Sequence, residues 1–189
     1  MQYVITVGSP IIAAILSACL AYYFTARRFR KQKWFEFDQR RLDEFYGPML
    51  NLIKQVRANI ETNTKISEVS DQAWQELCGR HPHPFEDHDK YFEPFNKALD
   101  DENERFNREY IPTLNKMLDI FKVKGHLAYP STENLFSEFS QYVAQLHRPL
   151  PYEVWKKLNP SAEPLAKLSA DIEAHVDNLR RKLSGDKRS

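Results

Sequence analysis

The stretch Tyr3–Ala26, YVITVGSPIIAAILSACLAYYFTA, decides the architecture of this chain, because none of its 24 residues carries a charged side chain. About 20 apolar residues in a helix, at 1.5 Å per residue, match a hydrocarbon core roughly 30 Å thick. Its serine and threonine hydroxyls are compatible with lipid, since they can bond back to a carbonyl one turn earlier. The stretch therefore predicts a transmembrane anchor over residues 1–26.

Basic residues flank the apolar stretch on one side only. No Lys or Arg precedes it, whereas a basic cluster at residues 27–33 follows at once: Arg27, Arg28, Arg30, Lys31 and Lys33. A cleavable signal peptide has its positive residues first, so this order favours a permanent anchor. Cationic flanks stay on the cytoplasmic side, and we therefore expect the N-terminus outside and the rest of the chain in the cytoplasm. The same cluster is expected to contact lipid headgroups.

Small residues recur at every fourth position of the anchor: Ser9, Ala13, Ser17 and Ala21. This spacing places them on one helix face, where they allow two backbones to approach closely. The pattern predicts self-association of the anchor. The alternative is that small residues are simply common in membrane helices.

Composition excludes several functional classes. A formal net charge of +1 over 189 residues does not favour nucleic acid as a partner. The five glycines are too scattered to form a phosphate-binding loop, so neither a cofactor nor a small-molecule substrate is inferred. Cys19 falls within the predicted anchor and cannot pair with Cys78, which agrees with a reducing compartment.

Apolar residues recur with three- and four-residue spacing in the rest of the chain, and no stretch alternates with period two. The fold class predicted is all-α, with the transmembrane helix continuing into an antiparallel bundle of about four main helices. A helical cytoplasmic domain is expected over 34–183, followed by a disordered tail at 184–189. The first main helix, which continues the anchor, is expected to end near Asn63. The other three are expected to cover 103–124, 131–147 and 161–183.

Individual residues set the expected boundaries of these helices. Gly47 and Pro48 predict a kink in the first helix, because proline removes a backbone hydrogen bond. A separate short helix is expected from Ser70 to Cys78, with Ser70 as its N-cap. Ser131 or Thr132 is expected to cap the helix that starts after Pro130.

The segment Arg80–Lys90, RHPHPFEDHDK, concentrates imidazole and carboxylate groups. His81, His83 and His88 with the neighbouring acidic residues offer ligand types that bind zinc or another divalent ion. Their spacing matches no defined metal motif, so a solvated loop is the alternative. A metal-dependent enzyme using the His81–His88 loop is accordingly one functional hypothesis.

Three segments carry a resemblance to a known group: RLDEFYGPMLNLI at 41–53, EYIPTLNKMLDIF at 109–121 and FSEFSQYVAQLHR at 136–148. Together they resemble small uncharacterised bacterial single-pass membrane proteins, in which an E-[LF]-Y-G-P segment follows the anchor and P-x-N opens a later helix. Here two residues, rather than one, separate Pro112 from Asn115. The resemblance implies this architecture and a bacterial origin, and it implies no activity. With the predicted anchor, we therefore expect a location in the bacterial inner (plasma) membrane.

The leading functional hypothesis is a membrane-anchored helical protein-interaction or scaffold module that self-associates and has no catalytic activity. Its expected partners are the lipid bilayer, a second copy of the chain or another protein. Aromatic residues at Trp34, Phe35, Phe37 and 91–95 could mark an exposed binding patch or could belong to the core. The alternative is a membrane-perturbing effector of a toxin or phage-defence system.

Overall fold

The computed structural model describes residues 3–80, 88–148 and 161–185. Side chains are described from residue 16 onward within these ranges, except at residues 88–91, 96, 99, 103 and 106. All regular structure in the described part is helical, so the all-α prediction is confirmed.

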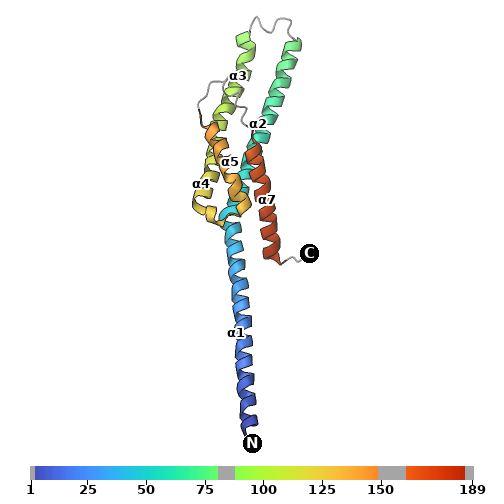
Figure 1. Ribbon diagram of the computed structural model, residues 1–189. Helices are drawn as coiled ribbons and strands as arrows, with labels where there is room; N and C mark the ends of the chain where they lie inside the picture. The colour runs from blue at the N-terminus through green and yellow to red at the C-terminus, as the bar shows by residue number, and fades with distance from the viewer. Residues whose placement is uncertain (1–2, 81–87, 149–160, 186–189) are drawn as a thin grey trace.

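One long helical path forms the axis of the molecule. Helix α1 (Tyr3–Arg41) passes through a π-helical turn, η1 (Leu42–Tyr46), into α2 (Gly47–Arg80). Figure 1 shows α1 projecting alone from one end, while the first half of α2 lies inside the bundle. At about 1.5 Å per residue the path is roughly 115 Å long.

The remaining elements pack around this axis. They are α3 (His88–Arg105), the π-helical turn η2 (Phe106–Tyr110), α4 (Ile111–Lys124), the 3₁₀ turn η3 (Gly125–Leu127), α5 (Pro130–Leu146) and α7 (Glu163–Ser184). The first half of α2 packs with α4 and α7, and α5 packs against α7 and α4. In Figure 1 the second half of α2 runs beside α3 beyond the bundle, and the C-terminal end of α7 points back toward α1.

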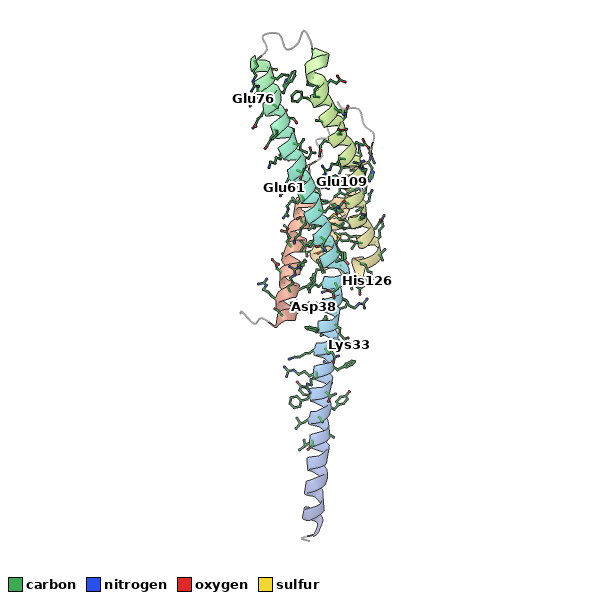
Figure 2. The ribbon with its side chains drawn as sticks, turned by 180° about the vertical axis from the view of Figure 1, so that it is seen from behind. Lys33, Asp38, Glu61, Glu76, Glu109 and His126 are labelled. Atoms are coloured by element: carbon green, nitrogen blue, oxygen red, sulfur yellow. The ribbon has the colours of Figure 1, made fainter. Side chains whose placement is uncertain are left out.

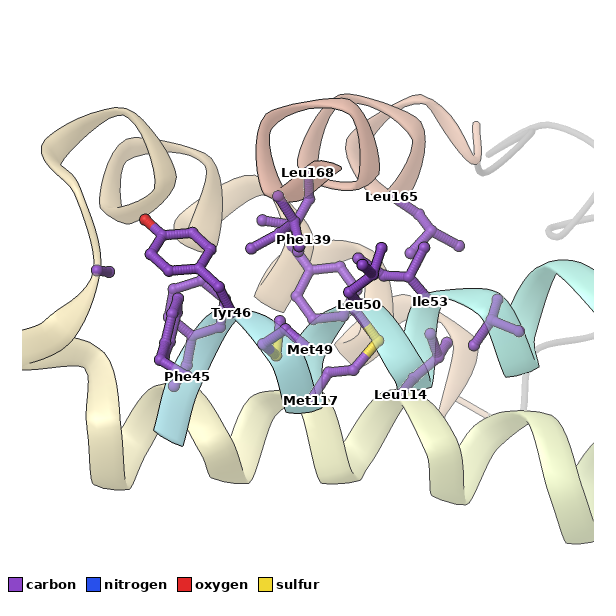
Figure 3. Close-up of a cluster of buried hydrophobic side chains, with 14 of the residues drawn as sticks. Phe45, Tyr46, Met49, Leu50, Ile53, Leu114, Met117, Phe139, Leu165 and Leu168 are labelled. Atoms are coloured by element: carbon purple, nitrogen blue, oxygen red, sulfur yellow. The ribbon is translucent and has the colours of Figure 1, made fainter. Parts of the chain in front are cut away.

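The core forms where the apolar stripes of four helices meet. Figure 3 shows Met49, Leu50 and Ile53 of α2 facing Leu114 and Met117 of α4, with α5 and α7 closing the other side. The buried stripe of α7 consists of Leu165, Leu168, Ile172, Val176 and Leu179. The predicted bundle of about four helices is confirmed.

Three predicted helix boundaries are wrong. The helix expected over 103–124 begins earlier, at His88, and runs as α3 through η2 into α4. Helix α2 does not end near Asn63 but continues to Arg80, so Ser70 lies inside a helix rather than at an N-cap. No proline or glycine falls between residues 49 and 78, and nothing local ends the helix there. Its far end is held by Trp74, whose ring packs edge-on against Phe92 and Phe95 of α3.

The start of α5 also differs from the prediction. Tyr129 is the N-cap, Pro130 is the first helical residue, and no side chain caps the helix. Proline suits this position because its missing N–H would have no helical partner there. The hydroxyls of Ser131 and Thr132 are therefore free to turn toward α7, where both find partners.

The two π-helical turns share a sequence pattern. Each ends at a tyrosine followed two residues later by a proline, within the repeated pattern Y-x-P-x-L-N at 46–51 and 110–115. Proline has no N–H to donate, so the preceding turn cannot keep its regular hydrogen bonds and the helix widens. The kink predicted at Gly47 and Pro48 thus takes the form of a π turn, in which the Gly47 N–H donates to the Leu42 carbonyl.

Among the helices that the structure describes with their side chains, none has a stretch long and apolar enough to cross a membrane. The described residues therefore give the predicted anchor over residues 1–26 no support. Of that stretch, residues 1–15 lie outside the residues whose side chains are described.

We predict that Gly47→Ala destabilises the bundle. A Cβ at position 47 would lie 2.7 Å from the Leu42 carbonyl oxygen, a backbone atom that no side-chain rotation can move. We expect a loss of roughly 1–3 kcal/mol in the free energy of unfolding, measured by calorimetry on the detergent-solubilised chain. Gly79→Ala is the matched control, since nothing lies within 4 Å of its Cβ position, and equal stability of the two variants would contradict the steric argument.

Candidate functional site

A chain of hydrogen bonds crosses the bundle at the Tyr46 hydroxyl, which is fully buried near the end where α1 enters. The backbone N–H of Tyr129 donates to this hydroxyl at 2.8 Å, and the Tyr46 oxygen lies 2.9 Å from Oγ1 of Thr132. The Thr132 hydroxyl in turn donates to Oδ2 of Asp171 at 2.5 Å. Each hydroxyl therefore accepts one hydrogen bond and donates one, in a single direction that ends at the carboxylate.

His175 extends this network on α7. Its Nε2 lies 2.9 Å from the Ser131 hydroxyl and 3.5 Å from Oδ1 of Asp171. The imidazole stacks on Tyr129 with ring centroids 4.3 Å apart, and the Arg41 guanidinium lies over the same tyrosine ring, 4.0 Å from its centroid. A cation, a phenol and an imidazole are thus layered where α1 enters the bundle.

Ser131, His175 and Asp171 have the residue types of a hydrolytic triad but not its geometry. In such a triad the carboxylate meets one imidazole nitrogen and the nucleophile meets the other, so that the imidazole can pass a proton between them. Here Ser131 and Asp171 both approach Nε2. The arrangement therefore joins α5 to α7 and does not pair a nucleophile with an oriented base.

Helix α5 supplies a hydroxyl partner to the tyrosine of each π turn. Thr132, in its first turn, meets Tyr46, and Tyr142, ten residues later, meets Tyr110 with the two oxygens 3.1 Å apart. Burial raises the pKa of Tyr46 to about 12, and it also raises the pKa of Tyr110. Both phenols stay protonated and act as hydrogen-bonding groups.

An ion pair fastens η1 to the end of α4. Lys124 and Arg40 both donate to the Glu44 carboxylate, and these hydrogen bonds lower its pKa to about 2. The π turn η1 is thus tied to α4 through Glu44 and to α5 through Tyr46.

The predicted site residues of α1 lie away from this network. Ser17 and Ala21 are exposed on the projecting part of α1, whereas the side chains of Ser9 and Ala13 lie outside the described residues. Trp34 and Phe35 are also exposed, and Phe37 is partly buried beside the Arg41 guanidinium.

The basic cluster 27–33 is exposed along the same helix (Figure 2). Within it, Lys33 pairs with Glu36 at 3.3 Å and lies over the Phe29 ring. No acidic side chain among the described residues forms an ion pair with the other four members, which are Arg27, Arg28, Arg30 and Lys31.

The predicted metal ligands His81, His83 and His88 lie outside the described side chains, and the metal hypothesis stays a prediction. In the part of the chain that the structure describes, no group of three histidine, cysteine or acidic residues is placed to hold a metal ion.

Charge is divided unevenly between one end of the molecule and the rest of the chain. The segment 59–105, which we name the arm, comprises the second half of α2, α3 and the residues between them, and it carries twelve acidic and five basic residues. Its net charge is therefore −7, against +8 for the rest of the chain. Figure 2 shows Glu61 and Glu76 on the arm and Lys33 on α1, on the other side of the bundle from Glu76.

Compared with protein families, curated proteins and solved structures, the chain matches none of them. The resemblance carried by the EFYGP segment stays a prediction.

Sequence analysis missed the residues of the hydrogen-bond network. Thr132 was expected only to cap a helix, and Asp171 and His175 were not singled out. Two signals in the sequence mark the site: the repeated Y-x-P-x-L-N pattern, and an acidic residue and a histidine four positions apart beside the apolar stripe of α7.

We predict that Tyr46→Phe weakens the fold and changes its response to alkali. At pH 7 we expect a loss of roughly 1–3 kcal/mol, because the Tyr129 N–H and the Thr132 oxygen lose a buried partner. The pKa of Tyr46 is raised in the folded state to about 12 from 10. The protonated hydroxyl therefore stabilises the native state fully below about pH 10, and this contribution is lost as pH rises through about 12.

Chemical unfolding at pH 7 to 12 measures both effects. The wild type should lose stability above pH 10 more steeply than Tyr46→Phe, whereas exposed Tyr22→Phe should follow the wild type. Parallel curves for the wild type and Tyr46→Phe would show that the Tyr46 hydroxyl does not titrate with unfolding.

Proposed function

We propose that this chain is a membrane-anchored helical module, in which α1 holds an interaction domain at the cytoplasmic face of a membrane. The observation that carries the proposal is the exposure of the large apolar and aromatic side chains of α1 between residues 16 and 24. Leu16, Leu20 and Tyr22 are 58%, 57% and 78% exposed, and no other described element covers them. A helix that is apolar on all sides is stable only where its surroundings are apolar as well.

The length of the uncharged stretch supports a bilayer as that surrounding. The 24 residues from Tyr3 to Ala26 would extend about 36 Å as a helix, enough to cross a hydrocarbon core of roughly 30 Å. Thr25, near the end of the stretch, donates its hydroxyl hydrogen bond to the Ala21 carbonyl at 2.7 Å. This internal bond removes the need for water at that hydroxyl.

The basic cluster supports the proposed orientation. Four of its five cations have no internal ion pair among the described residues, so their charge is available to anionic lipid headgroups. Positively charged flanks of this kind stay on the cytoplasmic side of a membrane. The bundle, the arm and the C-terminal end of α7 would then all lie in the cytoplasm.

A role in interaction rather than catalysis fits the two ends of the molecule. The buried network at Tyr46 joins helices, whereas α1 and the arm extend beyond the core and present exposed surface. The partners we propose are the bilayer, a second copy of the chain through the face of Ser17 and Ala21, and another protein.

The two native cysteines provide a test of the anchor and of its orientation. Cys19 is exposed in the middle of the uncharged stretch, and Cys78 is half-buried near the tip of the arm. In intact cells, a membrane-impermeant maleimide should label neither cysteine. After the cells are opened it should label Cys78 alone, because Cys19 would be in lipid.

Cys19→Ser and Cys78→Ser assign each signal to its residue. Labelling of Cys19 before detergent is added would overturn the anchor, and labelling of Cys78 in intact cells would overturn the orientation.

We predict that Ala21→Ile weakens self-association in vesicles, because a larger side chain keeps two helix backbones apart. The measurement is energy transfer between two dye-labelled populations of the chain. Cys19→Ile is the matched control, since it adds similar bulk two residues away, outside the small-residue face. Equal energy transfer for the two variants would remove this face from the proposal.

A further inference from the structure

The basic cluster is not uniform around the helix. Tyr23, Ala26, Arg27 and Arg30 together line a shallow, open hollow on one face of α1. Residues three, four and seven apart share a helix face, so Tyr23 stands one turn before Arg27 and two turns before Arg30. Arg28 and Lys31 do not line this hollow.

The two arginines of the hollow are available to an external anion. No acidic side chain of the described residues pairs with Arg27 or Arg30, whereas the nearby cations Lys33 and Arg40 pair with Glu36 and Glu44. The cations that border the apolar stretch are thus the ones without an internal counterion.

We infer that Tyr23, Arg27 and Arg30 form a binding site for the phosphate of an anionic phospholipid. Each guanidinium presents a planar fork of N–H donors that fits two phosphate oxygens, and two forks one turn apart can hold one phosphate group between them. The inference rests on the proposed membrane anchor. It goes further because part of the basic cluster would then act as a selective site and not only as a general surface charge.

Tyr23 indicates that the phosphate belongs to a lipid and not to the free ion. Its ring is exposed beside Phe24 at the end of the uncharged stretch, with the two ring centroids 5.9 Å apart. Aromatic side chains with a polar tip concentrate at the level of the headgroups, where the ring contacts the lipid chains and the hydroxyl reaches the polar layer. A ligand that touches Tyr23 and both arginines spans the boundary between apolar and polar regions, as a phospholipid does.

The test is lipid binding to the full chain in detergent, measured by native mass spectrometry with phosphatidylglycerol and, separately, zwitterionic phosphatidylethanolamine. We expect the wild type to retain phosphatidylglycerol in preference. Arg27→Gln/Arg30→Gln should reduce phosphatidylglycerol binding by roughly tenfold or more, since both guanidinium contacts to the phosphate are lost. Arg28→Gln/Lys31→Gln removes the same charge from the same segment and should reduce binding several-fold less.

Two further measurements sharpen the result. Arg27→Lys/Arg30→Lys keeps the charge but loses the planar forks, and it should bind less phosphatidylglycerol than the wild type. Inorganic phosphate at 10 mM, on the order of ordinary buffer strength, should not displace the lipid, because it cannot contact the apolar side of Tyr23.

Equal losses for the two glutamine double variants would overturn the inference, since they would reveal general charge attraction only. Displacement by inorganic phosphate would overturn it as well, because the site would then be one for the free anion. The maleimide experiment on Cys19 separates these failures from failure of the anchor. If Cys19 is protected and the two glutamine double variants lose phosphatidylglycerol binding equally, the anchor is supported and the lipid site is rejected.

Discussion

Burial of the Tyr46 hydroxyl is the constraint on which the bundle depends. A hydroxyl removed from water needs hydrogen-bond partners in the protein, and an unsatisfied one costs several times more than a typical hydrogen bond contributes. Both partners of Tyr46 come from the start of α5, and Thr132 carries the connection on to Asp171 of α7. The long axis formed by α1 and α2 is thereby joined to both α5 and α7. Glu44, two residues earlier, holds the same turn to α4 through Lys124.

The apolar stripes were predictable and the hydrogen bonds between helices were not, for a physical reason. A stripe such as Leu165, Leu168 and Ile172 depends on spacing within one helix, so local sequence reveals it. The Tyr46 partners lie 83 and 86 residues away in the chain, and only packing brings them together. Isolated polar signals also misled: Ser70 has the chemistry of an N-cap, but the helix continues through it because no proline or glycine interrupts the backbone nearby. The basic cluster and the small-residue face can be recognised directly in the sequence. Which of the cations form internal ion pairs is known only from the structure.

The same proline-containing sequence pattern forms both π-helical turns. Each Y-x-P-x-L-N segment places a helix-breaking residue just after a buried tyrosine and just before a core leucine, Leu50 or Leu114. The widened turn lets the helix change direction without ending, and the tyrosine hydroxyl meets a hydroxyl of α5 in both cases. Thr132 and Tyr142 are ten residues apart on α5, so about 15 Å separates the two points where this helix holds the kinked ones. In the first segment the position after the tyrosine is Gly47, where a Cβ would lie 2.7 Å from the Leu42 carbonyl oxygen.

The dimensions of the rod decide which charges a membrane could act on. If lipid ends near Ala26, as proposed, the basic cluster begins at once, within the Debye length of about 8 Å at physiological salt. Arg30 and Glu61 are separated by roughly 45 Å of helix, which is more than five such lengths. The acidic arm would therefore experience almost no repulsion from an anionic surface, and its charge is not needed to orient the molecule. In the proposed arrangement the cluster next to the uncharged stretch would set the orientation, and the arm, with its net charge of −7, would not be affected by the charge of the membrane surface.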